Sequence, residues 1–168
     1  MGESAPLGAV FQMGRGRAVR ELVSLVLFVA PAAGTAAGPA DRYVASLRPG
    51  LLRLERLDKA SNKPCVQDRF ALCAASARAE AAAARSLSQG LARESVPRLL
   101  VSANARLQRG LRALALVLDE AARLSDKRDG NGLYQLTRAF VKAFIDLDRS
   151  ILQIDKAVPS AKLPTFPP

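Results

Sequence analysis

The chain has 168 residues, 49% hydrophobic and 5% aromatic, and its 25 Lys and Arg against 15 Asp and Glu give a formal net charge of +10. That hydrophobic content excludes a wholly disordered chain, and the length is typical of one domain. The sequence has no His and only two Cys, which excludes Ser-His-Asp and Cys-His catalysis, His-ligated haem, His-containing zinc sites and a Cys-only zinc site.

The first predicted element is a targeting segment over residues 1–40. It contains an apolar run over 22–33, small residues over 34–40, and three preceding cations, Arg15, Arg17 and Arg20. A positive flank, a short apolar centre and a small-residue end are the parts of a secretory signal peptide. The apolar run would extend about 18 Å as a helix, well short of the ~30 Å hydrocarbon core of a bilayer.

We therefore expect cleavage after Ala37 or Ala40 and export to the periplasm, the cell surface or the medium. Two alternatives remain, namely that residues 22–40 are kept as a membrane anchor or that they form an N-terminal core helix. Removal of residues 1–40 takes away three Arg and two Glu, which leaves 22 Lys and Arg against 13 Asp and Glu. The net charge near +9 thus belongs to residues 41–168, which comprise the predicted domain over 41–158 and the tail that follows it.

The first two helices of this domain are predicted from their boundaries. The first is expected to be short and kinked, because Pro49-Gly50 interrupts its apolar pattern. The second is expected to begin near Pro64 or Asp68 and to end at Gly90. Nine of its fourteen residues over 71–84 are Ala, which gives a high helix propensity and little apolar area to bury.

Two further helices carry a heptad pattern, in which apolar residues recur at alternating spacings of three and four. The third helix has its seam at Leu100, Asn104, Leu107, Leu111, Leu114, Leu118 and Ala121. The fourth helix has its seam at Phe140, Phe144, Leu147, Ile151, Ile154 and Val158. Residues 159–168 include four Pro and are predicted to form an extended tail.

Short connections between long helices predict antiparallel neighbours. The expected fold class is therefore all-α: an antiparallel, up-down helical bundle of three long helices and a shorter, kinked first helix, placed after the N-terminal signal segment. The turn at 126–132 resembles a calcium loop in composition. However, its register places cations where the carboxylate ligands are required, so no metal and no cofactor is predicted.

Cys65 and Cys73 are a candidate disulfide. In one continuous helix their Cα atoms would lie about 12 Å apart, beyond the ~7 Å limit for a bridge. A bridge therefore requires a helix that begins after Cys65, and an oxidising compartment would favour it. Two free thiols, or pairing between chains, are the alternatives.

Two surfaces are candidate binding sites. A cationic stripe on the third helix, away from its seam, is a candidate face for anionic envelope polymers or lipid headgroups. Nucleic acid is less favoured, because no aromatic residue is interleaved for stacking. Its residues are Arg98, Arg109, Arg112, Arg123 and Lys127. An apolar stripe on the fourth helix is a candidate face for a protein partner or a second copy of the chain. Its residues are Tyr134, Val141, Ile145 and Leu152. An ordinary solvated face and a contact within the bundle are the respective alternatives.

These observations predict a non-enzymatic, exported helical bundle with a binding or scaffolding role at the cell envelope. One alternative is a membrane-anchored bundle whose basic face binds anionic lipid or other polyanions. A second alternative is an enzyme that uses only Asp, Glu or Lys, although the acidic pairs of the sequence are adjacent or two residues apart and diverge on a helix.

Overall fold

The computed structural model describes residues 37–66 and 69–166, which belong to one compact unit, Ala36–Pro168. Described residues form helices, turns and irregular chain, with no strand among them. The predicted all-α fold is confirmed, whereas the predicted targeting segment lies almost entirely outside the described residues. The helices are α1 (Pro39–Val66), α2 (Phe70–Leu91), the short 3-10 helix η1 (Arg98–Leu100), α3 (Val101–Asp126) and α4 (Gly130–Ala157).

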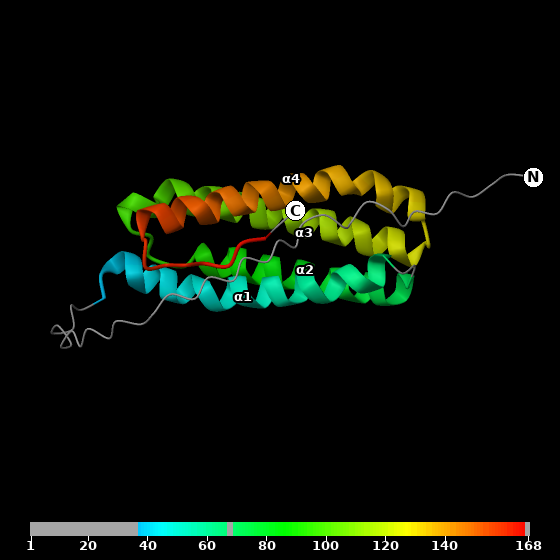
Figure 1. The fold of residues 1–168 in the computed structure, drawn as a ribbon, viewed down its shortest axis with the longest axis horizontal. Helices are drawn as coiled ribbons and strands as arrows, with labels where there is room; N and C mark the ends of the chain where they lie inside the picture. The colour runs from blue at the N-terminus through cyan, green and yellow to red at the C-terminus, as the bar shows by residue number, and fades with distance from the viewer. Residues whose placement is uncertain (1–36, 67–68, 167–168) are drawn as a thin grey trace, which may run out of the picture. The chain divides into compact units, whose positions relative to one another are not determined.

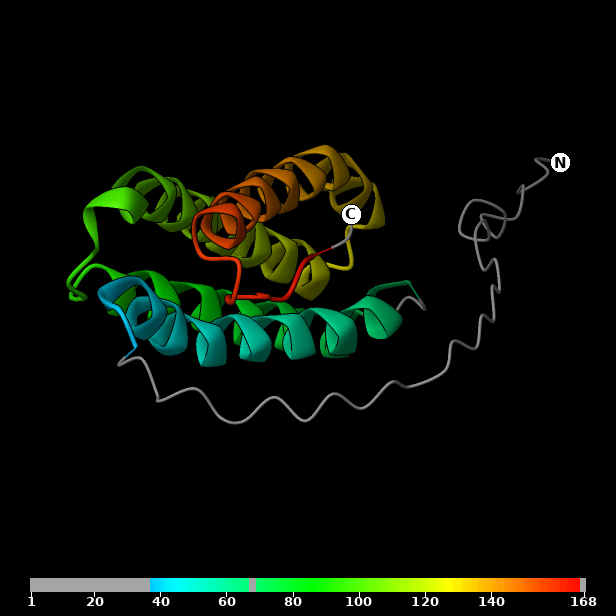
Figure 2. The same cartoon turned by 60° about the vertical axis from the view of Figure 1, so that its left-hand side comes forward.

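The four long helices run antiparallel in an up-down order (Figure 1). They pack in chain order, with α1 on α2, α2 on α3 and α3 on α4. Figure 2 shows the α1–α2 layer below the α3–α4 layer, with the C-terminal tail between α1 and α4. The bundle is therefore closed on one side by a non-helical segment.

The expected shorter first helix is wrong: α1 has 28 residues, as many as α4. Pro49 leaves one carbonyl of the preceding turn without its helical donor. Three fully buried leucines, Leu47, Leu51 and Leu54, hold the turns on both sides of it against the core. At Gly50, an added Cβ would meet the Cδ1 atom of Leu87 at 2.5 Å, so glycine leaves room for the Leu87 side chain between α1 and α2.

The alanines of α2 pack the helix closely between its two neighbours. Five of them are buried, namely Ala74, Ala77, Ala81, Ala83 and Ala84. Two ion pairs also join α2 to α3, one between Arg78 and Asp126 and the other between Arg85 and Asp119. Small side chains give little apolar area per residue, so α2 contributes mainly through close packing.

The two heptad seams predicted from the sequence face the core. In α3, Leu107, Leu111 and Leu114 are fully buried, and in α4 Leu147 and Ile151 are fully buried. The turn between these helices is short, and the Asp129 side chain caps α4 by accepting a hydrogen bond of 2.8 Å from the backbone N–H of Gly132.

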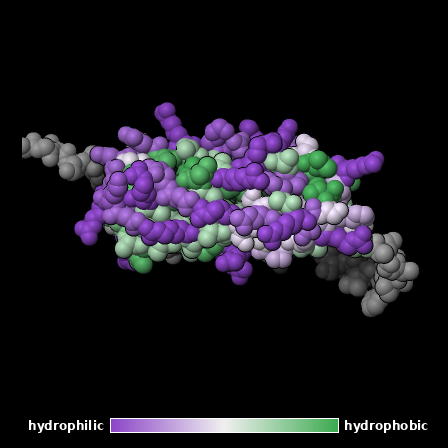
Figure 3. All heavy atoms as spheres, turned by 180° about the vertical axis from the view of Figure 1, so that it is seen from behind, coloured by the Kyte–Doolittle hydropathy of each residue, from purple (hydrophilic) through white to green (hydrophobic). Residues whose placement is uncertain are grey.

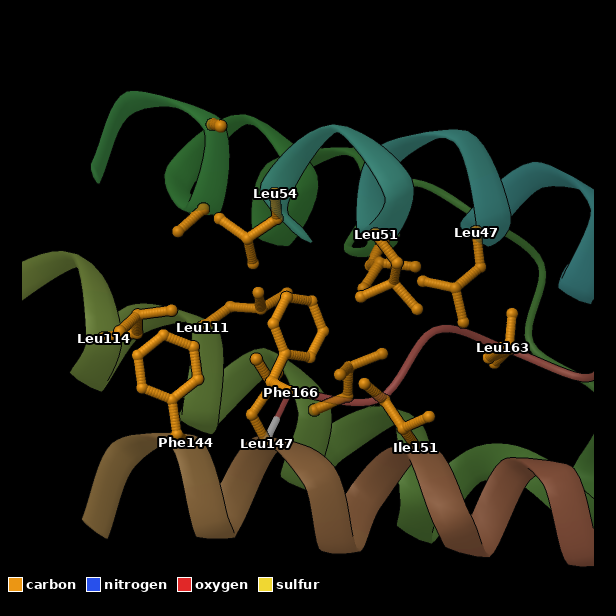
Figure 4. Packing of buried hydrophobic residues seen from close by; sticks show 14 of the residues in the cluster. Leu47, Leu51, Leu54, Leu111, Leu114, Phe144, Leu147, Ile151, Leu163 and Phe166 are labelled. Carbon is orange, nitrogen blue, oxygen red and sulfur yellow. The ribbon is translucent and has the colours of Figure 1, made fainter. Parts of the chain in front are cut away.

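The Pro-rich tail is not helical, because α4 ends at Ala157 and residues 159–160 form a turn. It is nevertheless an integral part of the core rather than a separate segment. Ala161, Leu163 and Phe166 are buried. Figure 4 shows the Phe166 ring between Leu54 of α1 and Leu147 of α4, and its centroid lies 5.8 Å from that of Phe144.

Polar contacts fix the path of this tail. Asp155 accepts a hydrogen bond from the backbone N–H of Leu163 at 3.1 Å, and Asp148 accepts one from the N–H of Phe166 at 2.8 Å. Arg48 of α1 donates to the carbonyl of Ala161. The tail is therefore held by α4 on one side and by α1 on the other.

Candidate functional site

A disulfide joins Cys65, in the last turn of α1, to Cys73, in the first turn of α2, with their Cα atoms 4.7 Å apart. The two residues lie in different helices, because α2 begins only at Phe70. The bridge links the two helices of the first hairpin beside the connection between them.

A buried carboxyl group lies between the same two helices. Glu80 of α2 is fully buried, and its Oε2 atom lies 3.2 Å from the hydroxyl of Ser61 in α1. Its Oε1 atom has no hydrogen-bond partner among the described residues. Burial, together with the nearby carboxylate of Asp58 and despite the hydrogen bond with Ser61, raises the pKa of Glu80 to about 7. Sequence reasoning missed this residue, because a single Glu in an Ala-rich helix does not indicate burial.

A second buried polar contact joins α1 to α3. The hydroxyl of Tyr43 donates a hydrogen bond of 2.8 Å to the amide oxygen of Asn104, the polar member of the α3 seam. Both side chains are buried. Burial, with a smaller contribution from the carboxylate of Glu94, raises the pKa of Tyr43 to about 12. The phenol therefore remains a neutral hydrogen-bond donor at physiological pH.

All five residues of the predicted cationic stripe are exposed, but they differ in their contacts and do not form one continuous set of free cations. Arg112 turns toward α2, where it donates to the hydroxyl of Ser88 at 3.4 Å. Arg123 forms an ion pair with Glu120. Arg98 and Lys127 lie in η1 and in the turn after α3, respectively. Among the stripe residues within α3, this leaves Arg109 without an ion pair or hydrogen bond to any described residue.

Arg109 lines a groove between α3 and α4 together with two arginines outside the predicted stripe. This groove has a volume of about 440 Å³, and its lining includes Arg106 and Arg109 of α3 and Arg149 and Asp146 of α4. The carboxylate of Asp146 is already paired with Lys142 at 2.6 Å. We call this groove, lined by the guanidinium groups of Arg106, Arg109 and Arg149, the cationic groove.

The cationic groove depends on tertiary packing. Gly110 of α3 packs against the backbone of Leu147 in α4, where an added Cβ would lie 3.5 Å from the Leu147 Cα atom. This close approach brings Arg149 beside Arg106 and Arg109. In the sequence, Arg106 lies off the predicted stripe and Arg149 lies on another helix. Only the packing of α3 against α4 shows that these residues line the same groove as Arg109.

The apolar stripe predicted on α4 lies on its outer surface. Tyr134 is 78% exposed, Leu152 46% and Ile145 36%, and Val141 is half-buried. Arg138 and Lys142 flank Val141 and Ile145 around a shallow depression of about 450 Å³ that also includes Arg149. The stripe therefore lies directly beside the cationic groove.

Seen from behind the view of Figure 1, hydrophobic residues form only small, separate patches among charged ones (Figure 3). None of the described helices is long and apolar enough to span a membrane. Within residues 37–66 and 69–166, no group of three or more His, Cys, Asp or Glu is placed to hold a metal ion.

The fold and these surfaces define an all-α, up-down bundle with a cationic outer groove and a neighbouring apolar stripe. Comparison with known proteins gives no match to a family, a curated sequence or a solved structure.

Proposed function

We propose that this protein is a non-enzymatic, exported helical bundle that binds a polyanion at the cell envelope through the cationic groove between α3 and α4. The observation that carries this proposal is the convergence of Arg106, Arg109 and Arg149 on one groove of about 440 Å³. Its single carboxylate, Asp146, is paired with Lys142.

The chemistry of the cationic groove suits phosphate, sulfate or carboxylate groups. Guanidinium groups present planar sets of N–H donors that match such oxyanions, and they stay charged at any physiological pH. Three like charges that share one groove without a neutralising partner repel one another, and a bound anion removes that repulsion. A repeating anionic ligand would also contact the neighbouring cations of α4.

A binding role is favoured over catalysis by the position of Glu80, a carboxyl group within the described residues whose pKa burial raises to about 7. Glu80 has the pKa that a general acid or base requires. It is fully buried between α1 and α2, where a substrate cannot reach it. Its role in the proposed function is therefore structural.

Export is supported by the disulfide between Cys65 and Cys73, since such bonds persist in oxidising compartments. The start of α1 favours one of the two predicted cleavage positions. The backbone N–H of Gly38 donates to the carboxylate of Asp41 at 3.1 Å. Cleavage after Ala37 keeps this contact, whereas cleavage after Ala40 removes the first two residues of α1. Intact-mass analysis should find a mature chain that begins at Gly38, and a cytosolic chain that retains residues 22–33 would contradict export.

The binding proposal is tested by retention on immobilised heparin as a function of salt. A triple variant replaces the three arginines of the cationic groove by Gln (Arg106→Gln, Arg109→Gln and Arg149→Gln). It should elute from heparin at a lower salt concentration than the wild-type protein, and its binding should depend less on salt. The matched control removes three exposed arginines elsewhere, with the variants Arg42→Gln, Arg53→Gln and Arg93→Gln. Equal losses in the two triple variants would show that only net charge matters, and would reject the groove as a site.

A further inference from the structure

We propose that the polyanion is the surface of an anionic bilayer, on which α4 lies through its apolar stripe with the cationic groove against the headgroups. This inference rests on the proposed function and names its ligand. It starts from Tyr134, Val141, Ile145 and Leu152, which follow one another at spacings of seven, four and seven residues. On a helix these spacings give one line about 27 Å long.

Charged side chains lie on both sides of this line, but those on the two sides are not equally free to contact a ligand. On one side lie Asp148 and Asp155, whose carboxylates already accept hydrogen bonds from the backbone of the tail. On the other side lie Arg138 and the ion pair of Lys142 with Asp146, followed by the cationic groove. The outer surface of α4 therefore changes from apolar to cationic, while the nearby acids are bound to the tail or paired.

The apolar stripe and the cationic groove beside it are together complementary to the interface of an anionic bilayer. Apolar side chains of a helix that lies in the interface reach the boundary of headgroups and acyl chains, and Lys and Arg lie beside the phosphates. Each cation near such a surface strengthens binding by roughly fivefold, as expected from the surface potential of anionic lipids. A soluble anionic polymer would use the cations and leave the apolar stripe in water.

A bilayer also fits the small size of the stripe better than a protein partner does. Standard protein interfaces bury about 800 Å² on each side. Four side chains on one convex helix, of which Val141 is half-buried and Ile145 only 36% exposed, offer far less apolar area. Shallow contact of a few side chains is sufficient at a bilayer when cations contribute as well.

The decisive measurement is cosedimentation of the protein with vesicles of phosphatidylglycerol and phosphatidylcholine, compared with vesicles of phosphatidylcholine alone. The wild-type protein should bind only the anionic vesicles. The double variant Ile145→Gln and Leu152→Gln should bind them about tenfold more weakly, because two partly exposed apolar side chains no longer enter the interface. Its retention on heparin should be unchanged. Leu72→Gln is the matched control, since Leu72 is 53% exposed on α2 and α2 does not pack against α4.

The two proposals fail in different ways. If the triple variant of the groove arginines loses no more heparin retention than the control triple variant, the polyanion site is rejected. Unchanged vesicle binding by the Ile145 and Leu152 variant, with heparin retention still dependent on the groove, rejects the bilayer alone. A concentration-dependent dimer that this variant abolishes in sedimentation velocity would also overturn the bilayer and assign the stripe to a second copy of the chain.

A spectroscopic measurement tests the docking position directly. The natural sequence has no Trp, so Leu152→Trp introduces a single reporter on the stripe and Leu72→Trp introduces one on α2. Emission from Leu152→Trp should shift to shorter wavelength when anionic vesicles are added, and emission from Leu72→Trp should not. Binding of Leu152→Trp to the vesicles without a shift would overturn the proposed orientation.

Discussion

The α1–α2 hairpin and the α3–α4 hairpin contribute to the same core with different side chains. In the second hairpin, large residues such as Leu111, Leu147 and Ile151 are fully buried, so packing of apolar area stabilises it. In the first hairpin, α2 contributes mainly alanines, and a disulfide and a fully buried carboxyl group lie at its interface with α1. The first hairpin thus adds a covalent link and a buried polar group to the small apolar area that α2 supplies, whereas both helices of the second hairpin supply large apolar side chains.

The C-terminal tail is a third component of the core, because it fills the space between α1 of the first hairpin and α4 of the second. Phe166 is 1% exposed and lies between α1 and α4 (Figure 4). The hairpins therefore meet through α2 and α3 on one side and through the tail on the other.

Replacement of Phe166 by Ala should separate the hairpins on their open side. Truncation of a fully buried Phe typically destabilises a protein by about 3–5 kcal/mol through lost burial and the remaining cavity. Urea denaturation followed by circular dichroism measures the change. Thr165→Ala, at an exposed neighbour, is the control. A loss below about 1 kcal/mol would mean that the tail does not belong to the core.

Glu80 should make the first hairpin sensitive to pH. The folded chain holds the proton of Glu80 up to a pKa of about 7, compared with 4.5 for an ordinary Glu side chain. A rise in pH between these two values therefore favours the unfolded chain, which releases the proton more readily. Stability from this source is fully present below pH 4.5 and is lost as the pH passes about 7.

Glu80→Gln should remove that loss, since Gln has the shape of the neutral carboxyl group. At pH 8 the variant should be more stable than the wild type by on the order of 3 kcal/mol, and near pH 4.5 the two should be alike. Thermal melts across pH 4.5 to 8 give the comparison. Glu120→Gln is the exposed control, because the hydrogen bond with Arg123 lowers the pKa of Glu120 and places its titration below this range. Parallel stability curves for Glu80→Gln and the wild type would refute a raised pKa.

Loss of the disulfide should affect the first hairpin more than the second. The bridge closes a loop with a sequence separation of eight residues, for which chain entropy gives a stabilisation of about 2–3 kcal/mol. Cys65→Ser with Cys73→Ser should lower the melting temperature, and amide hydrogen exchange should accelerate mainly in α1 and α2. Reductant should reproduce the effect in the wild type and have none in the variant. Uniform acceleration in all four helices would instead indicate a single cooperative unit.

The smallest effect concerns the polar contact between the hairpins. Asn104→Leu leaves the buried hydroxyl of Tyr43 without its acceptor, which costs about 1–3 kcal/mol. Adding Tyr43→Phe to that variant should recover most of this loss, whereas Tyr43→Phe alone should destabilise the protein by about 1 kcal/mol. A double-mutant cycle measures the coupling. Additive effects would show that Tyr43 and Asn104 do not interact.

By itself, the sequence determined the fold class and the two heptad seams, because helix periodicity is a local property that repeats along each helix. It also indicated the possible pairing of Cys65 with Cys73. The length of α1 was not predicted, since the leucines around Pro49 retain the helix only when they are packed against partners.

Only the tertiary structure decided which side chains of different helices meet. The burial of Glu80, the contact of Tyr43 with Asn104 and the insertion of Phe166 each require residues far apart in the sequence to come together. The same holds for the cationic groove, in which Arg106 and Arg109 approach Arg149 because α3 packs against α4 at Gly110 and Leu147. Periodicity specifies which face of a helix is buried, but the partner across that face is set by the packing of the whole bundle.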